Sequence, residues 1–482
     1  MSLRPWRPAA LAALAVANLA AVTFFLLSYH QHGISFGPDR IDLDVYRIGA
    51  RAWLRGASLY GHLPPTPAGP RLPFTYPPIA AMALAPLALV PATVAGTVLT
   101  LVTIALAAAV LRLFLLRLSL SPAATVWLLP AALFLEPVRS TLSFGQVNVI
   151  LMAMVAFDCL ADTPSWPRGV LTGLAAAVKL TPAAFVLFFL LRRDYRAAAI
   201  AGLSFAAATG LGFAAAGRDS VRYWTSIVFQ ASRVGQPDYA GNQSLQGVLA
   251  RAGLSPHAPA GLAAWLVLSL AVLVVAGLGM RRALAAGEPC LALSLNAFAA
   301  LLISPVSWSH HWVWCVPALL TLASLARRYH SRLAATAAAC GLVIFAAAPQ
   351  WWFPHGAGRE LRWAPWEQAA GSAYVLFAVV VLILAACGQP YWLESTGRGS
   401  DMPRFMDYHD DLKLPAEAIE QIAAGARDGA TDDFGVRQVE LYHDDDGHVY
   451  CLLDGPDEEA IRQHHEAIGV SCGDVHRVSG LA

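Results

Sequence analysis

The sequence predicts an all-α polytopic membrane protein that carries a small α+β domain at its C-terminus. Hydrophobic residues make up 57% of the 482 residues and charged residues only 13%, about half of the roughly 25% found in soluble domains. Residues 401–482 hold 19 acidic and 6 basic residues, whereas residues 1–400 hold 13 and 27. The net charge of +1 is therefore the sum of two opposite charges. It indicates a basic membrane unit and an acidic soluble tail.

About twelve apolar segments are expected to form the membrane unit, residues 1–390, which a linker at 391–401 joins to the soluble domain at 402–482. The first segment, Ala9–Ser28, is longer than the apolar core of a signal peptide, so we expect it to span the membrane. Several others are shorter than the ~20 residues of a spanning helix, which predicts tilted, broken or re-entrant helices. The later segments end near Pro91 or lie near 93–117, 121–136, 146–161, 169–191, 196–216, 260–279, 289–304, 310–326, 332–349 and 370–387.

Basic loops indicate how the chain is oriented in the plasma membrane. If the first helix enters from the cytoplasm, Arg192–Arg196, Arg281–Arg282 and Arg327–Arg332 fall inside, as the positive-inside rule requires. Arg112 and Arg117 fit poorly, so the number of crossings between 77 and 161 stays open. On this scheme the C-terminal domain is cytoplasmic and the active site is extracytoplasmic. The outside loops are 29–76, 217–259, 305–310 and 350–369.

The first outside loop holds a pair of carboxylates, Asp42 and Asp44, between apolar and aromatic residues. A carboxylate at the mouth of a membrane protein suits a general base. Between Asp44 and Leu59, apolar residues follow one helical face and arginines another, which predicts an amphipathic helix at the membrane interface. A loop helix that merely caps the bundle is the alternative. The arginines of this helix are Arg47, Arg51 and Arg55.

Polar residues in two later stretches are further candidates. Lys179 interrupts an apolar segment, where a charge usually has an anionic partner or lines a water-filled cavity; snorkelling to the interface is the alternative. The amides of Asn242 and Gln243 and the hydroxyl of Ser244 could hydrogen-bond sugar hydroxyls, and Arg251 lies one or two turns on. An ordinary turn with a helix cap would explain the same stretch.

Two adjacent histidines, His310 and His311, follow Ser304 and Pro305 in an aromatic stretch. Imidazoles at a helix mouth suit phosphate or sugar binding. Adjacent side chains on a helix point about 100° apart, so the pair is a poor metal chelate. Interfacial histidines within a tryptophan belt are the alternative.

The ordered set of motifs resembles glycosyltransferase family 87, the integral-membrane, polyprenol-phosphate-mannose-dependent α-1,2-mannosyltransferases of the GT-C superfamily. The matching stretches, within residues 10–390, are Asp42–Tyr46, Gly56–Tyr60, Phe74–Pro78, Gly145–Asn148, Lys179–Pro182, Asn242–Leu245 and Ser304–His311. The resemblance implies a GT-C fold, a base at Asp42 and a functional histidine at His310 or His311. Asp44 occupies a position that varies in the family.

The expected reaction is an inverting transfer of a sugar, mannose on the resemblance, from a polyprenyl phosphate to an extracytoplasmic glycolipid or glycan. A carboxylate would deprotonate the acceptor, and cations such as Lys179, Arg251 and His310 would hold the lipid phosphate. The transfer needs no cofactor, and the partners are lipids and not nucleic acid. The expected catalytic residues are Asp42 and Asp44, and the expected substrate-binding residues are Tyr76, Lys179, Asn242, Gln243, Arg251, His310 and His311.

Two other functions fit the same composition. A transporter or flippase of lipid-linked saccharides would also be polytopic, although transporters often show internal repeats and none is evident in the sequence. A degenerate membrane scaffold whose tail alone retains a function is the third hypothesis. Transfer of a labelled sugar to a lipid distinguishes the enzyme from both.

The tail has the order β-α-β-β-α-β of a ferredoxin-like domain. The expected strands are 402–409, 436–442, 449–453 and 474–478, with a turn at Asp446-Gly447, and the expected helices are 415–427 and 456–468. The tail resembles a small bacterial family of the DUF4242 type that has a nickel-binding member. That resemblance implies a divalent metal such as nickel at His409, Cys451 and His465, and imidazole and thiolate suit such an ion. An ordinary solvated acidic domain is the alternative.

Overall fold

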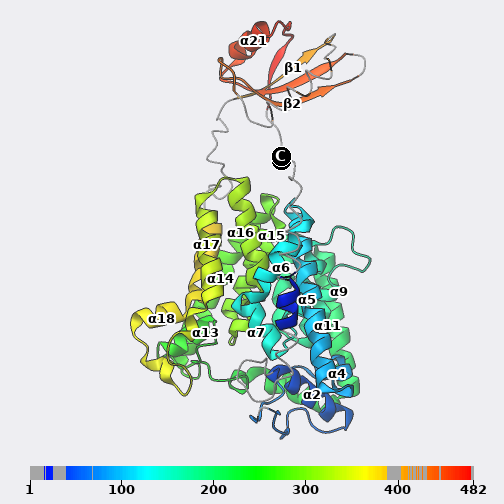
Figure 1. The fold of residues 1–482 in the computed structure, drawn as a ribbon, viewed down its shortest axis with the longest axis vertical. Coiled ribbons are helices and arrows are strands. Elements are labelled where there is room, and N and C mark those ends of the chain that lie inside the picture. The colour runs from blue at the N-terminus through cyan, green and yellow to red at the C-terminus, as the bar shows by residue number, and fades with distance from the viewer. Residues whose placement is uncertain are drawn as a thin grey trace. The chain divides into compact units, whose positions relative to one another are not determined.

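The computed structural model describes residues 16, 18–24, 40–67, 69–387, 403–410, 412, 415, 420, 422, 426, 431–444 and 447–478. The chain divides into two compact units, Met1–Glu394 and Ser395–Ala482. The first unit is helical and the second is built on an antiparallel sheet, as Figure 1 shows, so the predicted fold class is confirmed. Most of the expected first spanning helix, the linker 391–401 and most of the expected helix 415–427 lie outside the described residues.

The elements of the first unit follow the apolar segments of the sequence. Its α-helices are α2 (Ile41–Leu54), α3 (Pro78–Ala83), α4 (Ala85–Leu89), α5 (Ala92–Arg117), α6 (Thr125–Phe134), α7 (Glu136–Phe144), α8 (Asn148–Leu160), α9 (Val170–Val178), α10 (Val186–Leu191), α11 (Tyr195–Ala215), α12 (Gly217–Thr225), α13 (Leu245–Arg251), α14 (Pro259–Ala285), α15 (Pro289–Ile303), α16 (Cys315–Arg328), α17 (Arg332–Ala347), α18 (Pro365–Gly371) and α19 (Ala373–Cys387). Short 3-10 helices are η1 (Pro122–Ala124), η2 (Thr181–Phe185), η3 (Ile227–Phe229), η4 (Ala231–Arg233), η5 (Ser309–Trp314), η6 (Pro349–Trp351) and η7 (Arg359–Arg362).

Four helices in the described part of the chain are long and apolar enough to cross a membrane. They are α5, α11, α14 and the helix Arg332–Trp351, and a fifth is added if α18 and α19, bent by 70°, count as one span. Other predicted segments are broken. The short segment that ends at Pro91 divides into α3 and α4, as its length suggested. Segment 169–191 is long enough to span, yet it divides into α9, η2 and α10. The expected number of about twelve crossings stays a prediction.

Parts of three predicted outside loops gather at one end of the helical unit. Figure 1 shows α2, α13 and α18 at the same end of the long helices. These helices belong to the loops 29–76, 217–259 and 350–369 respectively. The arrangement agrees with a topology that places these loops on one side of the membrane.

Helix α2 differs from the expected amphipathic helix between Asp44 and Leu59. It begins at Ile41, so both carboxylates lie in its first turn, and it ends at Leu54. Gly56 follows with a φ of 68°, a left-handed conformation that is common just after a helix and is unstrained for glycine. Arg47 is buried and donates a hydrogen bond to the carbonyl of Leu87, because α2 packs on α4 instead of presenting all its arginines to solvent.

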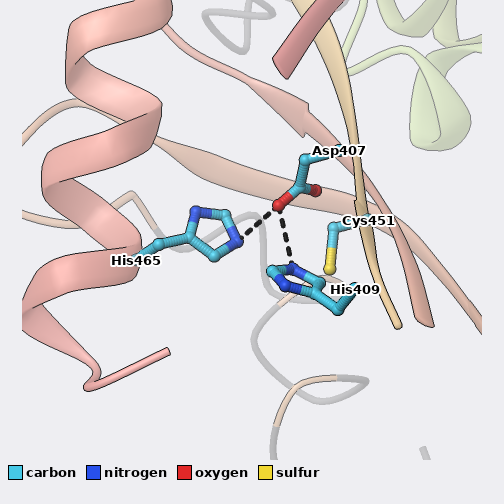
Figure 2. Close-up of side chains that lie close together, drawn as sticks. All are labelled: Asp407, His409, Cys451 and His465. Carbon is cyan, nitrogen blue, oxygen red and sulfur yellow. Dashed lines mark ion pairs between the residues drawn. The ribbon is translucent and has the colours of Figure 1, made fainter. Parts of the chain in front are cut away.

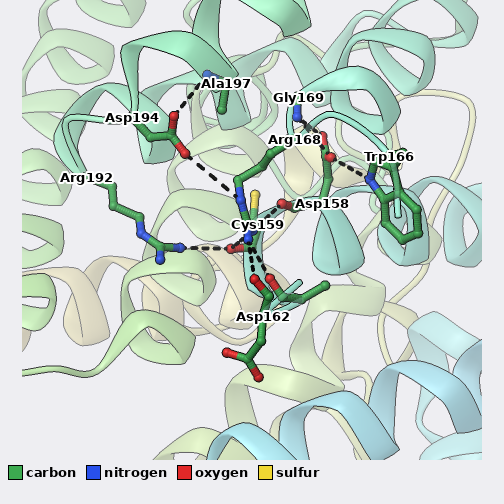
Figure 3. A network of polar contacts seen from close by, with 10 residues as sticks. Asp158, Cys159, Asp162, Trp166, Arg168, Gly169, Arg192, Asp194 and Ala197 are labelled. Carbon is green, nitrogen blue, oxygen red and sulfur yellow. Dashed lines mark hydrogen bonds and ion pairs between the residues drawn. The ribbon is translucent and has the colours of Figure 1, made fainter. Parts of the chain in front are cut away.

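A polar network fixes the connection between α8 and α9 (Figure 3). The buried Asp158 carboxylate accepts hydrogen bonds from the backbone N–H groups of Gly169 and Thr172, at 2.9–3.0 Å. The Arg168 guanidinium donates to the carbonyls of Cys159 and Ala161 at the end of α8. These contacts satisfy helix-end groups that would otherwise lack partners, and so they fix the start of the helix that leads to Lys179.

The described elements of the second unit follow the predicted ferredoxin-like order, except that most of the expected first helix lies outside the described residues. Its described elements are β1 (Arg404–His409), β2 (Arg437–His443), β3 (Val449–Asp454), α21 (Glu458–Ala467) and β4 (Val475–Val478). The strand order is β2-β3-β1-β4, and all pairs are antiparallel. Phe405, Leu453 and Ile461 belong to the apolar core of this unit. Gly447 of the expected turn has a φ of 98°, whereas Asp446 lies outside the described residues.

Candidate active site and metal cluster

Five of the predicted site residues line one cavity of about 690 Å³ in the first unit. They come from four motifs that are far apart in the sequence. The cavity lies within the 300–1,000 Å³ range of typical ligand sites. The five residues are Asp42, Tyr76, Lys179, His310 and His311.

Asp42 is held in the cavity wall by α2 and by a glutamine that the sequence analysis did not single out. Burial raises the pKa of Asp42 to about 6, although a hydrogen bond from Gln146 and the charge of Lys179 both act to lower it. Gln146 is itself oriented because its Oε1 accepts a hydrogen bond of 2.6 Å from the Tyr46 hydroxyl. Its signal in the sequence was its place in the motif Gly145–Asn148. A carboxyl with this pKa is ionised at neutral pH and remains basic enough to take a proton.

Asp44 lies two residues along the same helix and does not line the cavity. Side chains at i and i+2 of an α-helix point about 200° apart, so only one carboxylate of the pair can face the cavity. The separation comes from the helix and not from the alternation of an extended chain. Burial raises the pKa of Asp44, and the charges of Arg47 and Arg51 oppose that effect.

Lys179 extends from the end of α9 into the cavity and contacts two other motifs. Its Nζ lies 3.1 Å from Asn148 Oδ1 and 3.0 Å from His311 Nε2. An ammonium group only donates hydrogen bonds, so His311 accepts at Nε2 and carries its own proton on Nδ1. Nζ is also 6.0 Å from the centre of the Tyr76 ring. The cost of the charge is therefore offset by polar partners in a cavity.

The histidines lie on η5, which is anchored through its backbone. The carbonyl of His310 accepts hydrogen bonds of 2.8 Å from Thr141 Oγ1 and from Asn148 Nδ2. The ring of His310 packs edge-on against Phe144, with 5.2 Å between ring centres. Because Asn148 also contacts Lys179, one amide connects the lysine with the histidine loop.

Asn242, Gln243 and Arg251 do not line this cavity. Asn242 Oδ1 accepts a hydrogen bond from the backbone of Ser307, and the Gln243 amide donates to the carbonyl of Gly371. The Arg251 guanidinium donates to the carbonyl of Asn242 and to Ser372 Oγ. Ser244 caps α13 by accepting from the backbone of Gly247, so the alternative of a turn with a helix cap describes this stretch.

Glu136, at the start of α7, organises the far wall of the site although no motif contained it. The carboxylate is buried and accepts four hydrogen bonds of 2.8–3.1 Å. Two donors, Ser309 and Trp351, also line the cavity. The only signal in the sequence was an acid at the end of an apolar segment. The four donors are Ser140 Oγ, Ser309 Oγ, Trp351 Nε1 and Tyr374 OH.

The second unit contains a buried cluster of four groups that can bind a metal, shown in Figure 2. Asp407, His409, Cys451 and His465 place one ligand atom each within 4.8 Å of one another. Three of the four were expected. Asp407 was missed, although it lies two residues before His409 on the same strand, and such residues face the same side of a sheet.

The donors of this cluster fit a cation. The Nδ1 atoms of His409 and His465 lie 3.0 Å and 2.8 Å from backbone carbonyls, which accept their protons. Their Nε2 atoms then face the same carboxylate oxygen of Asp407, at 2.9 Å and 2.8 Å. Neutral imidazoles would direct lone pairs at a carboxylate, and a metal ion between them removes that repulsion. Burial is the largest single effect on the pKa of His465 and lowers it. The hydrogen bonds with Asp407 and the Ile461 carbonyl, together with the charge of Asp407, raise that pKa overall when no metal is bound.

Comparisons with known proteins found relatives of the helical unit and of the C-terminal unit. A family model described as glycosyltransferase family 87 matches residues 74–305. The chain is 44% identical, over 76% of its length and 88% of the relative, to the polyprenol-phosphate-mannose-dependent alpha-(1-2)-phosphatidylinositol mannoside mannosyltransferase of Mycobacterium tuberculosis. The enzyme of the same name from Mycolicibacterium smegmatis is 41% identical, over 72% and 83%. The chain belongs to glycosyltransferase family 87.

A second family model, described as nickel responsive protein SCO4226-like, matches residues 405–478. Both resemblances noted in the sequence are therefore confirmed. The family 87 model lies within the helical unit, and the nickel-responsive model matches most of the C-terminal unit. A crystal structure of ArnT from Cupriavidus metallidurans bound to undecaprenyl phosphate matches 92% of this chain and 98% of that one at 14% identity and a TM-score of 0.38; a likeness at that level supports no conclusion about this chain.

In this family 87 protein we expect Glu136→Ala to destabilise the helical unit strongly. The change leaves four hydrogen-bond donors without their acceptor, and an unsatisfied buried group costs about 1–3 kcal/mol. We expect the free energy of unfolding to fall by at least about 3 kcal/mol, and Glu136→Gln, which keeps one carbonyl oxygen, to lose less. Thermal unfolding in detergent measures both.

Ser140→Ala is the matched control for this prediction. It removes one of the four donors and leaves the acceptor in place, so it should cost about 1 kcal/mol or less. A Glu136→Ala protein as stable as the native chain would show that the carboxylate does not hold these segments together.

Proposed function

We propose that this protein transfers a mannosyl group from a polyprenyl phosphate to a hydroxyl of a phosphatidylinositol mannoside, with inversion at the anomeric carbon. The relatives described above are named for the same donor and acceptor classes. The observation that carries the chemical part of the proposal is that Asp42 shares one cavity with Lys179 and His311. A base and a phosphate-binding cation are the two groups that such a transfer requires.

In the proposed reaction Asp42 is the general base. It takes the proton of the acceptor hydroxyl while that oxygen forms a bond to the anomeric carbon. The bond between this carbon and the donor phosphate oxygen breaks, and the polyprenyl phosphate leaves with the electron pair. A single displacement of this kind inverts the configuration.

Lys179 and His311 are proposed to hold the leaving phosphate. The lysine donates to Asn148 and His311, and a third N–H remains for an anion because an ammonium has three. His311 accepts from the lysine through Nε2, so its Nδ1–H is a donor. Charge-assisted hydrogen bonds of this type are stronger than neutral ones and would stabilise the negative charge as it develops.

Apolar side chains beside the lysine would receive the near end of the donor's polyprenyl chain. A smaller hollow of about 50 Å³ shares Lys179 and His311 with the main cavity, and its other lining residues include Phe185 and Trp314. These two rings are stacked, with 4.8 Å between their centres. The phosphate would thus lie where the main cavity meets this smaller hollow.

We also propose that the cavity opens on the extracytoplasmic side and that the C-terminal unit is cytoplasmic. The support is the positive-inside pattern of the basic loops, together with the position of α2, α13 and α18 at one end of the helical unit. This side of the membrane is where a lipid-linked sugar would meet an envelope glycolipid.

We expect Asp42→Asn to reduce the rate of mannosyl transfer by about 10²–10⁴-fold, the usual contribution of general acid–base catalysis. The amide keeps the shape of the side chain but cannot take the proton. Donor binding should be retained, because the phosphate contacts are assigned to other residues. The measurement is transfer from labelled polyprenyl-phosphate-mannose to phosphatidylinositol mannoside by the purified protein.

Asp44→Asn is the matched control, since it removes the same charge from the same turn of α2 but outside the cavity. It should transfer mannose at close to the native rate. An active Asp42→Asn protein with an inactive Asp44→Asn protein would place the base at Asp44. Movement of the lipid across the bilayer without sugar transfer by the native protein would instead indicate a flippase.

We propose a second function for the C-terminal unit, the binding of a divalent metal such as nickel by Asp407, His409, Cys451 and His465. The histidine orientation described above supports it, as does the match to a nickel-responsive family model. Imidazole and thiolate ligands suit nickel and its neighbours in the first transition series. No step of the mannosyl transfer requires this ion.

Calorimetric titration of the full-length protein with a nickel salt should show one ion bound per chain. His465→Ala removes one ligand and should abolish binding or weaken it by at least 10-fold, the lower end of the effect of altering even an outer partner of a metal site. His476→Ala is the control, because His476 is an exposed histidine of β4 outside the cluster. Equal binding by both variants would refute the site.

A further inference from the structure

The charges that line the main cavity are not all used by the proposed reaction. Among the described residues of its lining, Asp42 is the carboxylate, and Lys179 and Arg233 are the permanent cations. Arg251, which was expected to help hold the donor phosphate, is engaged by backbone carbonyls and Ser372. Arg233 is thus a second cavity cation whose role the transfer mechanism leaves unassigned.

Arg233 lies close to the histidine loop. It ends η4, and Gly235, two residues later, packs against a cavity residue, Trp308. A Cβ added at Gly235 would lie 2.7 Å from the Trp308 ring, and the φ of Gly235 is 149°. Trp308 in turn precedes His310 by two residues. The close approach of backbone to ring fixes the segment that presents Arg233 to the cavity.

The guanidinium of Arg233 has no counter-ion in the described part of the chain. No carboxylate there lies within 4.0 Å of it, and its Nε is buried without a hydrogen-bond partner. Asp219, which lines no part of the cavity, is already engaged by Ser58 Oγ at 2.9 Å and the backbone N–H of Leu59 at 2.8 Å. A partly buried guanidinium without a partner is costly unless an anion binds it, and its planar fork suits the two oxygens of a phosphate group.

We propose that Arg233 binds the phosphodiester of an anionic lipid acceptor and makes the enzyme select such acceptors over neutral glycolipids. The inference rests on the proposed function, which supplies the reaction but does not assign a residue to this task. A transfer to a neutral acceptor needs one phosphate-binding group, and Lys179 with His311 provides it on the donor side. A second cation in the same cavity matches a second phosphate, which a phospholipid acceptor carries and a neutral one lacks.

Two acceptors that differ in this phosphate test the proposal: a phosphatidylinositol mannoside and an uncharged mannosyl diacylglycerol. For purified full-length Arg233→Ala we expect the KM of the phosphorylated acceptor to rise about 10- to 100-fold, the range expected for lost hydrogen bonds to a charged group. The KM of the neutral acceptor and the KM of the donor should not change. Arg233→Lys, which keeps the charge but loses the fork, should lie between.

Arg222→Ala is the matched control, because Arg222 is an exposed arginine of the same predicted loop that does not line the cavity. It should leave all three KM values unchanged, which separates a specific site from general attraction of anionic lipids. Thermal unfolding of each variant, with Arg233→Lys as the milder change, separates lost binding from lost folding. The proposal would be overturned if both folded variants, Arg233→Ala and Arg233→Lys, kept the native KM for the phosphorylated acceptor.

Arg233 could instead bind the phosphate of the donor, and the same assay distinguishes the two phosphates. If Arg233→Ala raises the donor KM equally with both acceptors, the arginine binds the donor and the proposal is wrong. Acceptor affinity is also measured without donor, by calorimetry with the native protein and the two Arg233 variants. That arm tests Arg233 even if the native protein transferred no mannose, a result that would refute the proposed function alone.

Discussion

The buried carboxylate of Glu136 is the contact on which the geometry of the cavity depends. Three of its donors, Ser309, Trp351 and Tyr374, lie 173, 215 and 238 residues away in the sequence. Hydrogen bonds to a charged acceptor in a weakly polar interior are strong, and leaving any of the partners unpaired is costly. A single acid therefore joins three distant segments to the start of α7, and His310 is placed through its neighbour Ser309.

Within the cavity, the acidic group Asp42 and the cation Lys179 act on each other's charge. Asp42 loses hydration on burial, which raises its pKa, while the charge of Lys179 limits the rise. His311 accepts from the lysine and so stays neutral. Under the proposed function, the cavity would hold a base that is ionised but still reactive, together with cations that receive a phosphate. On the further proposal, Arg233 would bind a second phosphate, because no carboxylate among the described residues pairs with it.

The sequence predicted the residues whose chemistry conflicts with their surroundings. Lys179 in an apolar segment and Asp42 at the mouth of a membrane unit have few explanations other than a site. For Asn242 and Arg251 the sequence could not separate a binding role from a structural one. An amide or guanidinium that binds a substrate has the same sequence signature as one that binds a nearby carbonyl. Arg233 escaped notice since an arginine in an outside loop is ordinary, and only folding places it in the cavity. Breaks within the apolar segments were expected from their lengths, but packing decides where they fall.

The pH dependence of kcat/KM for mannosyl transfer tests the role of Asp42 most directly. The carboxyl must be deprotonated to act as a base, and its pKa is about 6. The account predicts that kcat/KM is constant above that pH and falls about tenfold per pH unit below it, since only the ionised fraction is active. This acid limb should be absent from the residual activity of Asp42→Asn. A profile that stays flat well below pH 6, or an acid limb that persists in the variant, would contradict the assignment of Asp42 as the base.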